Sequence, residues 1–134
     1  MDPYVAQPNK GGTRRAKTHE RGVAASLGGR RQPGSGSSQR AKGDVKVTGP
    51  DDTRLLVECK TTMHGSLTVQ AEWLVKISAE AMAQGCYPAL AIEIDATKMA
   101  DVASRMGKSI PENRWVALPE SVLSGIMERL NADR

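Results

Sequence analysis

The chain has 134 residues, which suits a single domain with one modest core. It contains no Phe, two Trp and two Tyr, so the core must be aliphatic, and an oligomer interface would stabilise so small a domain. The sequence shows no apolar leader segment and no apolar run of about 18 residues, which predicts a cytoplasmic protein.

The two cysteines, Cys59 and Cys86, form no CxxC pair, and neither His19 nor His64 has metal-ligand spacing to a cysteine. We therefore expect no zinc site. Two isolated cysteines also make no disulfide framework, and we interpret both as reduced core residues of an intracellular protein.

The formal net charge of +4 is unevenly distributed along the chain. Residues 1–46 contain ten Lys or Arg and three acids, which gives +7, whereas residues 47–134 contain nine basic and twelve acidic residues, which gives −3. A basic segment beside a mildly acidic body is typical of a surface that binds nucleic acid. A solubilising basic tail has the same charge, so charge alone leaves both alternatives open.

The N-terminal segment, residues 1–16, is rich in Pro, Gly, Lys and Arg and shows no periodicity, so we expect a flexible basic arm. Thr18 is a candidate N-cap for a short helix that ends near Leu27. Glu20 is spaced to lie on the apolar face of this helix, where an unpaired charge is costly. Its partner could be an arginine or a metal ion, and the helix dipole offers a purely structural alternative.

Residues 28–43 (GGRRQPGSGSSQRAKG) have the composition of a mobile basic loop. Such a loop could fold onto a phosphate backbone, although a plain linker has the same composition. The candidate DNA-binding residues of the arm and this loop are Arg14, Arg15, Arg30, Arg31, Arg40 and Lys42.

Two segments, residues 44–48 and 54–62, alternate in polarity as β-strands, and the residues between them have turn composition. An antiparallel hairpin centred near Asp51 would place Asp44 opposite Glu58, with Cβ atoms about 4.5–5.5 Å apart. Lys60 shares the strand face of Glu58, whereas the intervening cysteine points to the other face.

The remaining segments predict alternating helices and strands. Thr68 opens a helix that ends before Gly85, with an apolar stripe at Ala71, Leu74, Val75, Ser78 and Met82 and with Trp73 and Ile77 on its flanks. Residues 88–94 are typical of a buried strand, 96–106 of a short helix, 114–118 of a strand, and a last helix starts at Pro119. This order predicts an α/β fold, a mixed central β-sheet flanked by helices, in a single domain over residues 17–134.

The expected pair of opposed carboxylates, Asp44 and Glu58, would destabilise a sheet unless a cation lies between them. Oxygen ligands favour a hard ion, Mg²⁺ or Mn²⁺, which retains waters and substrate phosphate oxygens. Lys60 could hold a hydrolytic water or stabilise charge on a phosphate, which is sufficient for phosphodiester hydrolysis. An acid and a lysine two residues apart more often form only a solvated strand face, so this motif alone has low specificity.

The pattern Gly43-Asp44, 13 residues, then Glu58-Cys59-Lys60 resembles the PD-(D/E)XK nuclease superfamily. Within it, residues 17–94 most resemble the archaeal-type Holliday-junction resolvases and their phage relatives. The resemblance implies a restriction-endonuclease-like fold with an αβββαβ core. Only two hairpin strands are evident in this sequence, so a third is expected around residues 62–67 or is missing.

The resemblance also implies roles at a metal centre. Asp44 and Glu58 would bind Mg²⁺ or Mn²⁺ together with the backbone carbonyl of Cys59. Lys60 would position or activate the water, and Glu20 would assist at the metal, directly or through water.

Other implied roles lie outside this centre. Gln70 would orient a catalytic group, Ser35 or Ser37 of the loop would contact the scissile phosphate, and a homodimer would cut two strands symmetrically in DNA recombination or repair.

Three functions remain open at this point. The first is a Holliday-junction resolvase, and the second is a nuclease of the same fold with nicking, end-processing or restriction-type specificity. The third is a non-catalytic DNA-binding or architectural module, in which the basic arm is functional and the carboxylates are structural.

Overall fold

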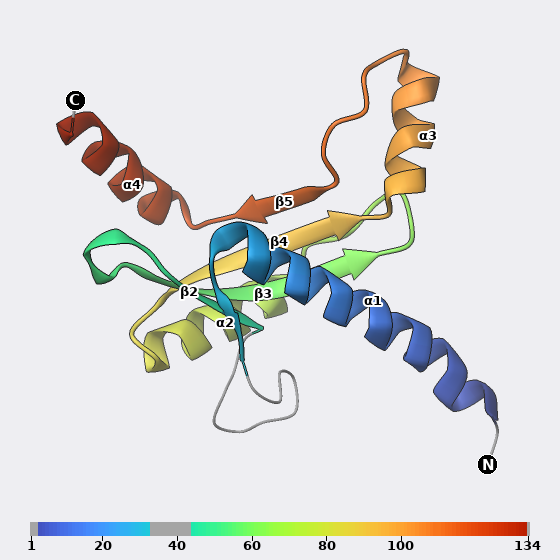
Figure 1. The fold of residues 1–134 in the computed structure, drawn as a ribbon, viewed down its shortest axis with the longest axis horizontal. Coiled ribbons are helices and arrows are strands. Elements are labelled where there is room, and N and C mark those ends of the chain that lie inside the picture. Colours follow the sequence, from blue (N-terminus) through green and yellow to red (C-terminus); the bar gives the residue numbers. More distant parts are fainter. Residues whose placement is uncertain (1–2, 33–43, 134) are drawn as a thin grey trace.

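The computed structural model of the chain describes residues 3–32 and 44–133, with side chains for 14–32, 44–49 and 51–133. Its elements are α1 (Pro3–Leu27), β1 (Arg30–Arg31), β2 (Val45–Thr48), a 3-10 turn (Pro50–Asp52), β3 (Arg54–Thr62), α2 (Ala71–Ala83), β4 (Tyr87–Ile94), α3 (Ala96–Met106), β5 (Arg114–Ala117) and α4 (Glu120–Ala132). The predicted α/β class is confirmed: a mixed sheet is flanked by helices (Figure 1). Within these described ranges, no helix is both long and apolar enough to cross a membrane.

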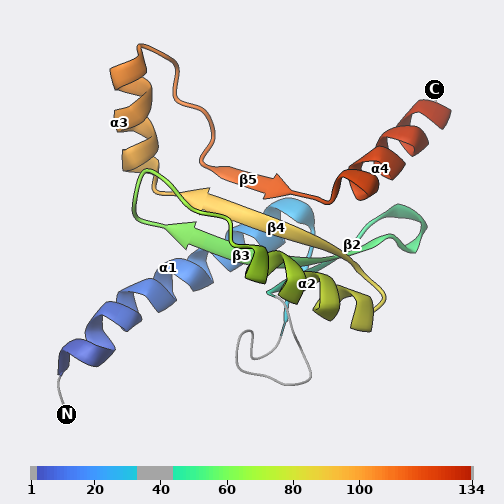
Figure 2. The ribbon, with the colours of Figure 1, turned by 180° about the vertical axis from the view of Figure 1, so that it is seen from behind.

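The five-stranded sheet has the order β1-β2-β3-β4-β5. Only the β3–β4 pair is parallel, with α2 as the crossover between these two strands. Helix α1 packs on one face against β2 and β3, and α2 packs on the other against β3 and β4. The two ends of β5 lead to α3 and α4, which project away from the sheet (Figures 1 and 2).

The hairpin of β2 and β3 has the register that the sequence predicts. Val45 pairs with Val57 and Thr48 with Arg54, which places the centre of the hairpin at Asp51. Asp51 and Asp52 adopt left-handed backbone conformations, with φ of 58° and 56°, and such conformations are tolerated by Asp better than by most residues. Turn chemistry and strand alternation were therefore sufficient to fix this register.

The third strand before α2 lies elsewhere than expected. Arg30 and Arg31 form β1, which pairs antiparallel with the outer edge of β2 through Lys46 and Val45. A third strand was expected around residues 62–67 or was expected to be missing; Thr62 ends β3, and residues 63–67 form no strand. Residues 33–43 of the predicted loop are outside the described ranges, but its first part contributes a strand, so three strands lie between the first two helices.

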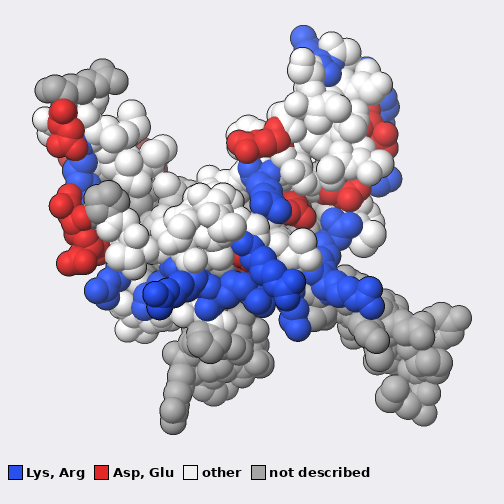
Figure 3. Space-filling view, viewed as in Figure 1, with Lys and Arg blue, Asp and Glu red and all other residues white. Residues whose placement is uncertain are grey.

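Helix α1 is much longer than expected. It begins at Pro3, so the expectations of an irregular arm and of a helix start at Thr18 are wrong for residues 3–17. Proline is tolerated at a first helical position, but the glycines and the second proline of this segment made a helix improbable from propensity alone. Lys and Arg side chains gather along the border of the molecule where α1 and the β1–β2 end of the sheet lie (Figure 3).

Helix α2 begins at Ala71 and not at Thr68, and it buries a different face from the one predicted. Ile77 and Ala81 are buried against Leu56 of β3, whereas Val75 and Met82 of the predicted stripe are exposed. The helix carries apolar residues nearly all round, so periodicity could not select the buried side.

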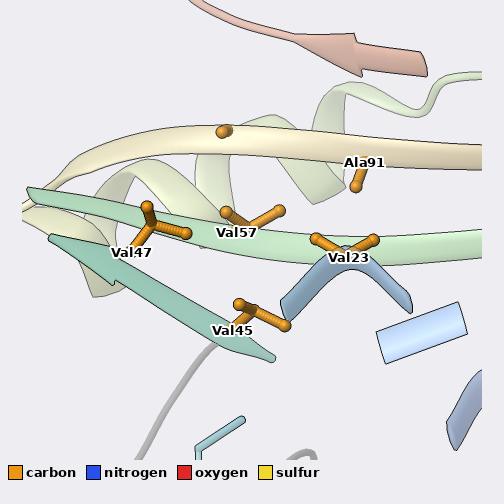
Figure 4. Packing of buried hydrophobic residues seen from close by; sticks show 6 residues of the cluster. Val23, Val45, Val47, Val57 and Ala91 are labelled. Carbon is orange, nitrogen blue, oxygen red and sulfur yellow. The ribbon is translucent and has the colours of Figure 1, made fainter. Parts of the chain in front are cut away.

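The main core lies between α1 and the sheet. Val23 of α1 packs on side chains from three strands, which are Val45, Val47, Val57 and Ala91 (Figure 4). All are small or β-branched, as expected for a chain without Phe. This packing fixes α1 over the start of β2, where the candidate site lies.

Candidate active site

The carboxylates of Asp44 and Glu58 meet where β2 begins. The amide of Asp44 donates to the Val57 carbonyl at 2.9 Å, and Oδ2 of Asp44 accepts a hydrogen bond from the Cys59 amide at 2.7 Å. Asp44 is thus held by the residues on both sides of Glu58, and the two carboxyl groups are hydrogen-bonded to each other. The structure therefore brings together the two acids that the predicted register opposed.

Glu58 is strongly perturbed by this environment. Its side chain belongs to a residue only 7% exposed, and burial, followed by the hydrogen bond and the negative charge of Asp44, raises its pKa to about 8. The nearby ammonium groups of Lys60 and Lys76 oppose this shift. At neutral pH Glu58 therefore holds its proton, as expected of a buried carboxyl beside a second carboxylate.

Two lysines flank the pair on the α2 side of the sheet. The Lys60 ammonium lies 4.6 Å from the ring centroid of Trp73, a favourable cation–π distance. The Lys76 Nζ lies 3.8 Å from Glu58 Oε1 and 3.8 Å from Glu80 Oε1. Trp73 is half-buried and supports the catalytic candidate Lys60, a role that the sequence did not indicate.

Glu20 approaches from α1, on the other face of the sheet. It is 7% exposed, and its Oε2 lies 4.0 Å from Nη2 of Arg31 in β1. Of the two partners considered for this acid, the structure supplies the arginine. The pairing with Arg31 also depends on β1, which the sequence did not reveal.

The pKa of the Cys59 thiol is raised by burial and by the charges around the site. Burial raises its pKa first, and the negative charges of four surrounding carboxylates raise it further: Asp44, Glu20, Glu58 and Glu93. An uncharged thiol thus occupies the centre of an acidic region formed from α1, β2, β3 and β4. Both cysteines of the chain are free.

A network that sequence reasoning missed lies beside this region. The fully buried His19 approaches the Ala91 carbonyl with Nε2 at 3.2 Å and Glu93 Oε2 with Nδ1 at 3.4 Å. Glu93 also accepts a hydrogen bond from Nε of Arg114 at 3.0 Å. The one available signal was a lone acid in the apolar segment PALAIEI, since a buried carboxylate requires partners.

The donor set partly fits a hard divalent cation. Asp44 and Glu58 offer two adjacent carboxylates, and the pKa of Glu58 is raised first by burial and then by Asp44, so a cation there would favour the charged form of Glu58. In the described part of the chain, no group of three or more His, Cys, Asp or Glu side chains is placed to hold a metal ion. The expected ligands are two carboxylates and a backbone carbonyl, and Mg²⁺ usually completes its shell with water and substrate oxygens.

The other candidates are less well placed. Gln70 is exposed at the N-cap of α2, where its backbone carbonyl accepts the Trp73 amide and its side chain makes no cap hydrogen bond. Arg14 and Arg30 are exposed, whereas Arg15 is 3.4 Å from Asp95. The loop candidates lie outside the described residues: Ser35, Ser37, Arg40 and Lys42.

Comparison with known proteins gave no match: no protein family, no curated protein and no solved structure is significantly similar to this chain.

Proposed function

We propose that this chain is a divalent-metal-dependent DNA endonuclease of the PD-(D/E)XK type that cuts four-way branched DNA as a homodimer. The observation that carries the proposal is the adjacent pair of carboxyl side chains, Asp44 and Glu58, with Lys60 on the same strand as Glu58. A buried Glu58 beside the carboxylate of Asp44 would destabilise the fold if the pair had only a structural role. The element order α1-β1-β2-β3-α2-β4 supports the proposal as well, because it contains the three strands of the αβββαβ core.

Each residue of the site has a defined task in this proposal. Asp44, Glu58 and the backbone carbonyl of Cys59 hold Mg²⁺ or Mn²⁺, which when bound supplies Lewis-acid stabilisation and a more acidic water. The Lys60 ammonium orients the attacking water or stabilises the negative charge that develops on the phosphate. The ring of Trp73 limits where this ammonium can go. Glu20 assists from α1.

Substrate binding follows from the charge distribution. Arg14 of α1 and Arg30 of β1 are exposed. Lys and Arg side chains gather along the border of the molecule where these two elements lie (Figure 3). Phosphate contacts of this kind position a substrate without reading its sequence. The preference for branched DNA rests on the resemblance of the sequence to junction resolvases.

The test uses a labelled four-way junction and a linear duplex of matching sequence, each with Mg²⁺ or with EDTA. We expect paired symmetric nicks on the junction that EDTA abolishes. Asp44→Asn should lower the cleavage rate at least about 100-fold, since removal of a ligand should cost more than removal of an outer-shell partner. Asp101→Asn, which removes an exposed acid of α3, is the matched control and should cleave normally.

A second readout is independent of cleavage. Mg²⁺ should raise the thermal midpoint of the wild-type protein and of Asp101→Asn but not that of Asp44→Asn. Equal cutting of junction and duplex would retain the nuclease and refute the preference for branched DNA. DNA binding without metal-dependent cleavage would refute the nuclease and favour a non-catalytic module.

A further inference from the structure

The outer edge of β5 is not paired within the described chain. This strand is the last in the sheet order, and all four of its residues, Arg114–Ala117, are exposed. Figures 1 and 2 show no other segment beside this edge, only α3 and α4 projecting at its two ends. An open edge presents unpaired backbone groups and is a template for another strand.

The register identifies which backbone groups point outward. The Ile94 amide donates to the Asn113 carbonyl at 3.0 Å, so Asn113 directs its backbone toward β4. Since hydrogen-bonded and free positions alternate along an antiparallel strand, Trp115 and Ala117 also face β4. The amide and carbonyl groups of Arg114 and Val116 therefore point to the open edge.

Apolar side chains accompany this edge. Trp115 is 55% exposed and Val116 is 46% exposed. Further exposed apolar residues lie at both ends of the strand, with Met106 and Ile110 on the α3 side and Leu123 and Met127 on the α4 side. In the described chain 14 large hydrophobic residues are exposed and 12 hydrophobic residues are buried, a balance that favours a lasting partner over an isolated monomer.

A second copy of this chain fits the edge by symmetry. Two identical strands that pair antiparallel are related by a two-fold axis, so each supplies the same groups to the other. In this arrangement the α4 end of one copy lies beside the α3 end of the other, and the two apolar ends meet. A four-residue strand pair alone is smaller than the about 1,200 Å² of a stable interface, so these flanking contacts are needed.

We propose that two copies of the chain pair antiparallel along β5, which joins their sheets into one continuous sheet. The dimer itself belongs to the proposed function, but its interface is inferred from the free edge and the exposed apolar residues, and its test needs neither DNA nor metal. The candidate sites lie at the β2–β3 end of each sheet, so the interface leaves both open. The two β3 strands would be five strand spacings apart, or about 24 Å.

The experiment measures the molar mass of the purified chain by light scattering, from low micromolar to submillimolar concentration, with EDTA and without DNA. We expect twice the 14.4 kDa of the chain. Val116→Pro removes an amide that points outward, so the monomer loses no ladder hydrogen bond while the edge loses a donor. This variant should be monomeric with an unchanged circular dichroism spectrum. Val75→Lys, on the exposed side of α2, is the control and should remain dimeric.

A monomeric wild-type chain would refute the interface, as would a dimeric Val116→Pro variant. If Val116→Pro fails to fold, hydrogen exchange of the wild-type chain tests whether the β5 edge is paired with a second copy. The Val116 amide should be protected at high concentration and exchange faster on dilution. Exchange that is fast at all concentrations would show that the edge is open and would refute the proposal. Loss of nuclease activity has no bearing on any of these results.

Discussion

Glu58 acquires its raised pKa from the backbone that surrounds it. The register of β2 and β3 sets Asp44 beside it, and the sheet and α2 exclude water from it. Lys60 and Lys76 are close enough to lower its pKa but not to cancel the effect of burial. If Glu58 binds a cation as proposed, it must release this proton, because a metal ligand must be deprotonated.

This shift predicts a pH dependence of stability. Between the ordinary value of 4.5 and about 8, folded Glu58 holds a proton that the unfolded chain has released. The free energy of unfolding should therefore fall, through this group, as the pH rises across that window and level off above it. Glu58→Gln removes the effect and should be more stable than wild type at pH 8.5 by at least about 1 kcal/mol, allowing for partial solvent access.

Urea unfolding of both proteins across this pH range, in EDTA, measures the difference. Glu80→Gln is the matched control, since it removes the other acid that contacts Lys76 and leaves Asp44 untouched. The difference between Glu58→Gln and wild type should grow with pH, whereas that for Glu80→Gln should not. A Glu58→Gln protein that is less stable than wild type at pH 8.5 would contradict the prediction that the charged form of Glu58 destabilises the folded state.

At the scale of the element, the rotation of α2 decides what the site contains. With Ile77 and Ala81 toward β3, the helix also turns Trp73 and Lys76 toward Lys60 and Glu58. The stripe predicted from periodicity would have buried Val75 and Met82 instead. The same rotation of α2 thus determines both which residues pack on the sheet and which side chains reach the candidate site.

Substitutions on the two sides of α2 test this rotation. Ile77 is 2% exposed, so Ile77→Ala should lower the free energy of unfolding by about 2–4 kcal/mol through lost burial and a residual cavity. Val75 is 69% exposed, and Val75→Ala should change the free energy of unfolding by less than about 0.5 kcal/mol. Denaturant unfolding measures the stability of both variants. A larger loss of stability for Val75→Ala than for Ile77→Ala would mean that α2 buries the stripe predicted from periodicity.

At the scale of the whole molecule, positive charge is segregated from the acidic centre. The acids around Cys59 come from both faces of the sheet, whereas Lys and Arg gather along the border of the molecule where α1 and the β1–β2 end of the sheet lie (Figure 3). In the proposed function, the basic border attracts the DNA, and the acidic site repels its phosphates unless a cation is bound. Metal and substrate binding should therefore reinforce each other.

The border predicts a salt dependence of DNA binding. Each neutralised phosphate contributes a slope of about −0.9 to the logarithm of affinity against the logarithm of salt concentration. The double variant Arg14→Ala/Arg30→Ala should reduce the magnitude of this slope by up to about 1.8, because both residues are exposed on the border elements. Fluorescence anisotropy with a junction and Ca²⁺ in place of Mg²⁺ measures the slope.

The control for this measurement is Arg105→Ala, which removes an exposed arginine of α3, away from α1 and β1. Its slope should equal that of wild type. An unchanged slope in the double variant would mean that α1 and β1 do not contact the DNA backbone.

The sequence by itself determined the local features of this protein. Strand alternation and turn chemistry, which act over a few residues, gave the β2–β3 register and set Asp44 beside Glu58. Caps and periodicity likewise gave α3, β4, β5 and α4 close to their observed bounds. These signals suffice because each depends on interactions between residues close in the chain.

Only the tertiary structure decided features that depend on distant partners. A two-residue strand such as β1 has no periodicity, and it exists because β2 offers an edge to pair with. A helix that is apolar on several sides, such as α2, acquires its buried face from the sheet. His19 and Glu93 are 74 positions apart in the sequence but meet beneath α1, where burial makes each require the other.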